Sequence, residues 1–223
     1  MRYPLLLILS LAVVPRIARG QTCMGQTSYT SGSVKVGAGA EFGNGGTTFT
    51  GSAGLGRPHG IFGAAAAGFV TGSDGTGALV SGLIGKELSD PIVGRLKLCP
   101  VAGLGLQFGP TGYYERNYLL GAMVGYPLTT SSGHLRIILT GGCQGAYQQN
   151  GFHDNTQLTG YRRADRSAGG NGLHEWYGLL DAGVGLIFSG RFSVVPQVRV
   201  PLGYSFRDPS FLIRGSVNFG KGN

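Results

Sequence analysis

Charge is scarce in this sequence. Lysine, arginine, aspartate and glutamate make up 13% of the 223 residues, about half the share of an ordinary soluble domain. Beyond the first twenty residues there is also no apolar run of the roughly 20 residues that a transmembrane helix requires. Cysteine occurs three times, an odd number that implies no complete disulfide framework. These shortages argue against a helical membrane protein, a disulfide-stapled domain and a soluble domain with a charged exterior.

Glycine, in contrast, is abundant, with 43 residues in a chain long enough for one domain. The glycines follow no G-X-Y period, which excludes a collagen triple helix. They alternate with Val, Leu, Ile and Phe, a pattern that can bury surface and therefore argues against disorder.

The first twenty residues predict an export signal. Arg2 precedes the apolar stretch Pro4–Val14, which is too short to span a bilayer, and Ala18-Arg19-Gly20 supplies small residues at the cleavage-determining positions. We therefore expect residues 1–20 to be a signal peptide that is removed. Residues 21–30 would then form a short periplasmic N-terminal segment, residues 31–219 the folded domain, and residues 220–223 a C-terminal tail.

Period-two alternation recurs along the rest of the chain and predicts about ten strands. Residues 61–71 and 77–87 show it least clearly, and a polar insertion from Gln148 to His174 interrupts it. If the mature N-terminus is periplasmic, this insertion lies outside the cell and the tight Ser189-Gly190-Arg191 turn lies in the periplasm, as is usual for outer-membrane barrels. The predicted strands are residues 34–42, 48–55, 61–71, 77–87, 96–108, 117–126, 135–140, 180–188, 194–200 and 211–219.

The leader, the continuous apolar face and the weakly charged second face favour a membrane barrel over a soluble β-sandwich. In lipid every backbone polar group must be paired internally, and a closed barrel achieves this without edges. The sequence thus predicts an all-β fold, a closed antiparallel transmembrane β-barrel of about ten strands, with eight as the alternative. Pro100, Pro196 and Pro201 fall inside predicted strands, where we expect bulges or irregular pairing.

The last predicted strand, Phe211–Phe219, has apolar residues on one face and ends on an aromatic residue. With this strand the region Ser31–Phe219 resembles the small bacterial outer-membrane barrels of the OmpX and OmpA kind. The resemblance implies location in the bacterial outer membrane, contact with outer-membrane lipid and lipopolysaccharide, and a monomeric state. It also implies that the assembly machinery recognises this strand, through Phe211, Ile213, Val217 and Phe219.

The second face of each strand should line the barrel interior. We expect side chains to fill this interior, with a narrow water-filled passage as the alternative. Centring the last long hairpin on Gly190 places Asp181 opposite Arg199, both facing the lumen, where they should form an ion pair. Further charges are expected in the lumen, namely Lys35, Glu41, Lys97, Arg136 and Arg214.

The cysteines offer one open pairing. Cys99 and Cys143 lie on strands separated by a third strand and point to opposite faces, so a bridge between them would violate disulfide geometry. Cys23 with Cys99 remains open as a bridge near the periplasmic rim.

No pattern in the chain predicts catalysis or a cofactor. The Gly-x-Gly pairs lack the third glycine of a dinucleotide fingerprint, and no second histidine follows His174-Glu175 to complete a zinc motif. His59, His134 and His153 fall in predicted turns or loops, as does His174. No basic cluster interleaved with aromatic residues indicates nucleic acid. We therefore expect a protein that is not an enzyme and that binds no cofactor, metal or nucleic acid.

The polar insertion carries Tyr161, Arg162, Arg163 and Arg166. These residues could bind the phosphates of lipopolysaccharide or a host glycan. The alternative is an ordinary solvated loop that binds neither. The expected role is structural, adhesive or one of surface recognition. A narrow passive pore is the alternative, followed by an outer-membrane hydrolase and a soluble secreted β-sandwich.

Overall fold

The structure, a computed structural model of the chain, describes residues 22–26, 34–44, 46–57, 60–72, 75–89, 96–109, 113–128, 135–152, 174–203 and 208–219. The predicted signal peptide, the C-terminal tail and the arginines at positions 162, 163 and 166 with Tyr161 lie outside the described residues. Among the described residues, no helix has the length and apolar character needed to cross a membrane.

Ten antiparallel strands close into a barrel, which confirms the predicted fold and strand number. Each strand pairs with its sequence neighbours, and the pairings of β1 with β11 and of β4 with β6 close the ring. A short β5 (Leu88–Ser89) continues the line of β4. The ring strands are β1 (Val34–Gly43), β2 (Gly46–Gly56), β3 (Ile61–Gly72), β4 (Gly75–Lys86), β6 (Lys97–Phe108), β7 (Tyr113–Leu128), β8 (Leu135–Phe152), β9 (His174–Phe188), β10 (Phe192–Leu202) and β11 (Ser210–Phe219).

The period-two pattern decides which side chains face outward. Every ring strand contributes exposed large apolar residues to the outer surface, among them Val36, Phe69, Leu104, Leu120 and Ile213. The side chains between them point inward, and there the polar and charged residues are buried. The outer surface of the barrel is therefore apolar, and the buried polar and charged residues of the strands face the lumen, as is typical of a membrane barrel.

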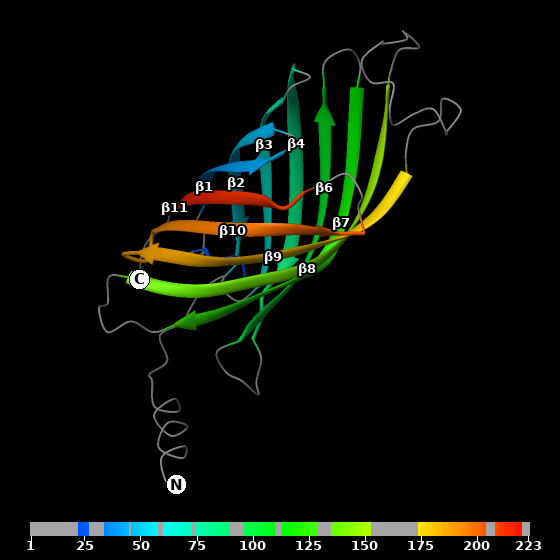
Figure 1. Cartoon of the computed structure of the whole chain (residues 1–223). Coiled ribbons are helices and arrows are strands. Elements are labelled where there is room, and N and C mark those ends of the chain that lie inside the picture. Colours follow the sequence, from blue (N-terminus) through cyan, green and yellow to red (C-terminus); the bar gives the residue numbers. More distant parts are fainter. Residues whose placement is uncertain are drawn as a thin grey trace.

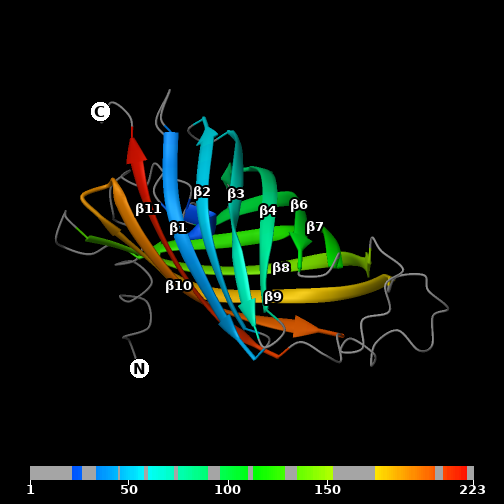
Figure 2. The same cartoon turned by 90° about the horizontal axis from the view of Figure 1, so that it is seen from above.

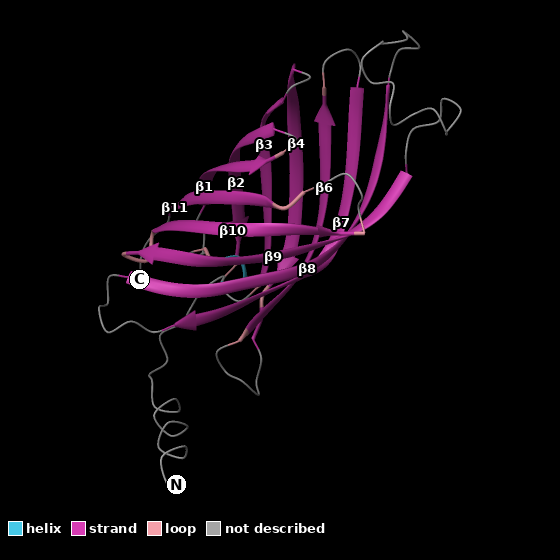
Figure 3. Cartoon of the chain, viewed as in Figure 1, coloured by secondary structure: helices cyan, strands magenta, loops and turns pink. Residues whose placement is uncertain are grey.

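The two ends of the barrel differ. We call the end where β1 begins and β11 finishes the terminal end, and the opposite end the loop end. Strands β7, β8 and β9 have 16, 18 and 15 residues, against 10 to 12 for the other ring strands. Figure 1 shows these long strands rising toward the loop end, and Figure 3 shows that strands make up almost all of the described chain.

The prolines disturb the ladders without shifting the register. The ladder to β6 stops at the pair Gly85–Val101, just before Pro100, and resumes at Leu88–Leu98 in the same register. The β9–β10 ladder is interrupted between Val194 and Gln197, around Pro196, and then resumes in the same register. Irregular pairing is thus found at these two prolines. Pro201 pairs with Leu179 in an unbroken ladder.

Candidate functional site: the barrel lumen

The lumen holds most of the charged residues that the sequence placed there. Lys35 and Lys97 are buried at the terminal end, 4% and 7% exposed. Glu41 and Arg214 lie on the inner face of β1 and β11. Arg136 also follows the inward register, opposite Ile187, but lies exposed at the terminal rim.

Asp181 and Arg199 lie opposite each other on β9 and β10, as the hairpin register predicted. The register follows from the tight turn, in which Ser189 and Gly190 both have positive φ, 48° and 68°. Arg199 Nε donates to Asp181 Oδ1 at 2.8 Å, and the Asp181 side chain is 2% exposed. The fixed turn therefore brings a buried carboxylate in the middle of β9 against a guanidinium on β10.

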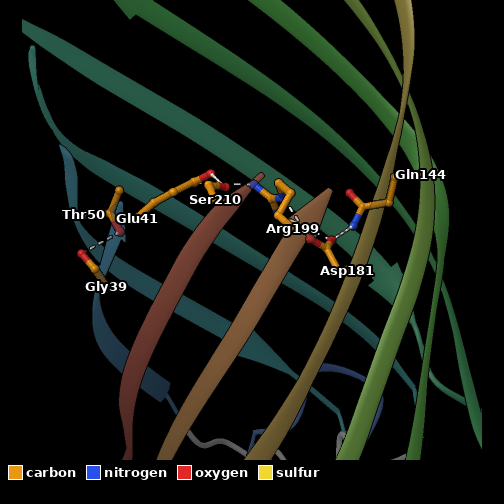
Figure 4. A network of polar contacts seen from close by, with 7 residues as sticks. All are labelled: Gly39, Glu41, Thr50, Gln144, Asp181, Arg199 and Ser210. Atoms are coloured by element: carbon orange, nitrogen blue, oxygen red, sulfur yellow. Dashed lines mark hydrogen bonds and ion pairs between the residues drawn. The ribbon is translucent and has the colours of Figure 1, made fainter. Parts of the chain in front are cut away.

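The pair is the centre of a wider network (Figure 4). Gln144 Nε2 of β8 donates to Asp181 Oδ2 at 2.6 Å. On the other side, Arg199 Nη1 lies 3.5 Å from Glu41 Oε2 of β1, and Ser210 Oγ donates to Glu41 Oε1 at 2.7 Å. The network connects five neighbouring strands from β8 to β1, across the seam where the chain closes on itself.

A second feature, absent from the sequence-based prediction, is an N-terminal segment inside the lumen. Residues Thr22–Met24 form a 3-10 turn, η1, and we name Thr22–Gln26 the crossbar. Figure 2 shows this blue turn within the ring of strands. Residues 21–30 were expected to lie in the periplasm, but the described part of this segment is folded into the terminal end of the barrel.

The crossbar is fixed at both of its ends. Cys23 is fully buried and forms a disulfide with Cys99 of β6, the pairing that the sequence left open. At the other end, Gly25 has φ +67° and lies so close to Gly185 of β9 that a Cβ on Gly185 would collide with the backbone of Gly25. A Cβ on Gly25 would also lie 2.9 Å from both Thr140 Cγ2 and Val195 Cγ1. The segment thus reaches from β6 across the lumen to β8, β9 and β10.

Apolar side chains fill the lumen next to the crossbar. Cys23 and Cys99 pack with Phe62, Val101 and Met123 in one cluster. A second cluster is made by Ala146, Tyr177 and Leu179, and Leu119 packs against both clusters. The first cluster therefore fills the terminal half of the lumen beside the crossbar, and the second lies farther along β8 and β9, on the loop side of Asp181.

Glu87 is a charged residue just outside the strands at this end. It is 3% exposed, and burial raises the pKa of its carboxyl to about 7, against the opposing influence of Lys97 and Lys35. Gln26 of the crossbar accepts a hydrogen bond from Lys35 Nζ at 3.5 Å. Charge at the terminal mouth is thus linked to the crossbar.

The remaining cysteine and the side chains that were predicted to be recognised by the assembly machinery face outward. Cys143 is free and exposed, on the opposite face from Cys99, as expected. Phe211, Ile213, Val217 and Phe219 share the outward face of β11, the strand that closes the ring against β1.

Comparison with known proteins assigns the chain to no family. No protein-family model matches the chain, and no curated protein matches it. The N-terminal β-barrel domain of Pseudomonas aeruginosa OprF is 14% identical, with a TM-score of 0.36, covering 84% of this chain and 97% of the domain. The β domain of the Bordetella autotransporter BrkA is 12% identical, with a TM-score of 0.49, covering 84% and 98%. The KdgM porin is 8% identical, with a TM-score of 0.41, covering 83% and 99%. The chain is a closed antiparallel β-barrel, and the strand pairing establishes this by itself.

Proposed function

We propose that the chain is a monomeric outer-membrane barrel that is closed to solutes and serves a structural, adhesive or surface-recognition role. The apolar outer surface supports the membrane location, because a soluble monomer rarely exposes an apolar patch larger than a few hundred Å². The β11 outward face, with its terminal Phe219, supports recognition by the outer-membrane assembly machinery. The proposal includes no catalytic role, and hydrolysis of phospholipid or peptide by the purified barrel would overturn that part.

The main support for a closed lumen is the position of the crossbar. It crosses the lumen and is bonded covalently to β6. It also packs so tightly that a Cβ added at Gly25 would displace the side chains of Thr140 and Val195. A passage for solutes would have to pass this segment and the two apolar clusters in the lumen. A barrel built this way holds the loops at its loop end in the membrane and does not conduct solutes.

Planar-bilayer recording of the oxidised mature protein tests this proposal. We expect no steady unitary openings. The C23S/C99S variant, in which the crossbar loses its covalent bond, should open at least intermittently. Steady channels formed by the oxidised protein would overturn the closed state.

A narrow pore is the second candidate, because small residues line the lumen opposite the crossbar. Gly37, Gly39, Thr50, Ser52 and Ala66 face inward on β1, β2 and β3. If water passes along this side, the oxidised protein will conduct, and substitution of Ser52 by a large residue will reduce the conductance.

Membrane location and orientation are tested separately. The protein should resist alkaline and urea extraction and migrate on gels in a heat-dependent way, whereas full release into the soluble fraction would contradict membrane insertion. Protease added to intact cells should cut near Arg162–Arg166 if the β8–β9 connection is outside. Cleavage only after rupture of the outer membrane would reverse the orientation.

A further inference from the structure

The outward face of the barrel is almost free of charge. Among the outward positions of the described strands, Lys86 and Arg116 are the only residues with a full charge. Lys86 lies at the terminal end of β4 and Arg116 near the loop end of β7. Between them the surface is uncharged, so each cation marks one border of the apolar belt.

Arg116 belongs to a row of three polar side chains on neighbouring strands. The ladders pair Arg116 with Gln149 and Gln149 with His174, and all three point outward. Arg116 and His174 are exposed. We name Arg116, Gln149 and His174 the polar row.

A row of aromatic side chains lies directly beneath it, toward the apolar belt. Tyr118 pairs with Tyr147, and Tyr147 with Trp176. The ring centroids are 6.2 Å and 4.7 Å apart, and Trp176 is 73% exposed. Tyr and Trp in this position are typical of the border between the hydrocarbon core and the headgroup layer. The polar row is therefore at the level of the lipid headgroups.

The polar row is held in place and its charge is not neutralised by the neighbouring strands. Tyr147 Oη and His174 Nδ1 are 2.9 Å apart, which fixes the imidazole and directs Nε2 away from the tyrosine. The Arg116 guanidinium lies 5.3 Å from the centroid of the Tyr114 ring. The nearby carboxylates of the described strands, Glu115 and Glu175, follow the inward register. The row thus offers guanidinium, imidazole and amide donors on one outward face.

We propose that the polar row binds a phosphate on the headgroup of a phosphorylated glycolipid in the surrounding leaflet, of the lipopolysaccharide class. Arginine recognises phosphate through a planar set of donors, and the amide and imidazole extend this set along the strand-to-strand direction. The exposed Trp176 and Tyr118 rings beneath contact the sugar or upper acyl region of the same lipid. This inference rests on the proposed membrane location, and it names a lipid that the barrel wall binds.

The test is native mass spectrometry of the purified mature protein in detergent, titrated with bisphosphorylated lipid A. The wild-type protein should bind lipid A, and R116Q/H174Q should lower its affinity by about tenfold, since charge-assisted hydrogen bonds to phosphate are lost. R116K should keep part of the affinity, because lysine retains the charge but not the planar set of donors. K86Q is the matched control, because it removes the other outward cation at the opposite end and should leave binding unchanged.

Several results would overturn the site. Equal binding by wild type and R116Q/H174Q would remove the polar row from recognition. Displacement of lipid A by inorganic phosphate at low millimolar concentration would make this a site for free phosphate. Equally tight binding of a dephosphorylated glycolipid would assign recognition to the aromatic row and the sugar. Heat-dependent gel migration checks that each variant is folded, and failure of the wild-type protein to insert into membranes would refute the membrane location instead.

Discussion

Removing either partner of the Asp181–Arg199 pair should destabilise the barrel, and the two losses should not add. D181A leaves Arg199 with only the longer contact to Glu41, at 3.5 Å. It also removes the carboxylate oxygen that accepts a hydrogen bond from Gln144 at 2.6 Å. R199A leaves a carboxylate that is 2% exposed and that keeps the hydrogen bond from Gln144. In either variant a charge stays in the lumen without its main counter-charge.

The magnitude follows from burial. Breaking a buried pair costs about 3–5 kcal/mol, and the remaining contacts to Glu41 and Gln144, together with the 21% exposure of the Arg199 side chain, favour the lower end. We expect each single variant to lose about 3 kcal/mol of unfolding free energy and the coupling between them to be about 1–3 kcal/mol.

The assay is a double-mutant cycle in urea with the barrel folded into lipid vesicles, followed by heat-dependent gel migration. D181N separates charge from hydrogen bonding, since the amide keeps an oxygen for Gln144, and it should recover part of the loss. A parallel cycle of D181A with R136A is the control, because Arg136 lies exposed at the terminal rim and distant sites add within about 0.5 kcal/mol. Coupling near zero for Asp181 and Arg199 would refute the ion pair as a stabilising contact.

Three further outcomes concern the terminal end. Reduction of the Cys23–Cys99 bond should lower unfolding free energy by about 2–4 kcal/mol, measured in urea, whereas C143S, at the free outward cysteine, should change nothing. G185A should displace the crossbar, because its Cβ would collide with Gly25; increased conductance or faster proteolysis of the N-terminus measures this, and an unchanged protein would contradict the packing. The raised pKa of Glu87, about 7 against an ordinary 4.5, means that the charged form is disfavoured in the folded state. Stability should therefore rise as pH falls from above 7 to below 4.5, and E87Q should flatten this profile in urea titrations.

The alternation of side chains was sufficient to predict the fold. Period two over ten segments separated by Gly-rich turns determines which face each residue occupies, and a one-residue slip would turn the apolar face inward. For the same reason the Asp181–Arg199 pair was predictable, since a tight hairpin turn at Gly190 fixes the register of two strands that are adjacent in sequence. The opposite faces of Cys99 and Cys143 follow from the same parity.

The long-range contacts of the lumen required the closed ring. Glu41 reaches Arg199 only because β1 pairs with β11, so strands from opposite ends of the chain become neighbours. The bond from Gln144 to Asp181 depends on the register across the long β8–β9 connection, which no short turn fixes.

The sequence alone therefore determined the barrel, its inward and outward faces and the contacts across its tight hairpin, because these depend on local periodicity and one turn. Only the tertiary structure decided the crossbar. Thr22–Gln26 shows no alternation of apolar and polar residues, and no tight turn joins it to a neighbouring strand and so fixes its position. It lies in the lumen because Cys23 meets Cys99 and because Gly25 and Gly185, 160 residues apart by their numbering, approach too closely for any side chain. Such a fit between distant segments exists only once the ring has closed.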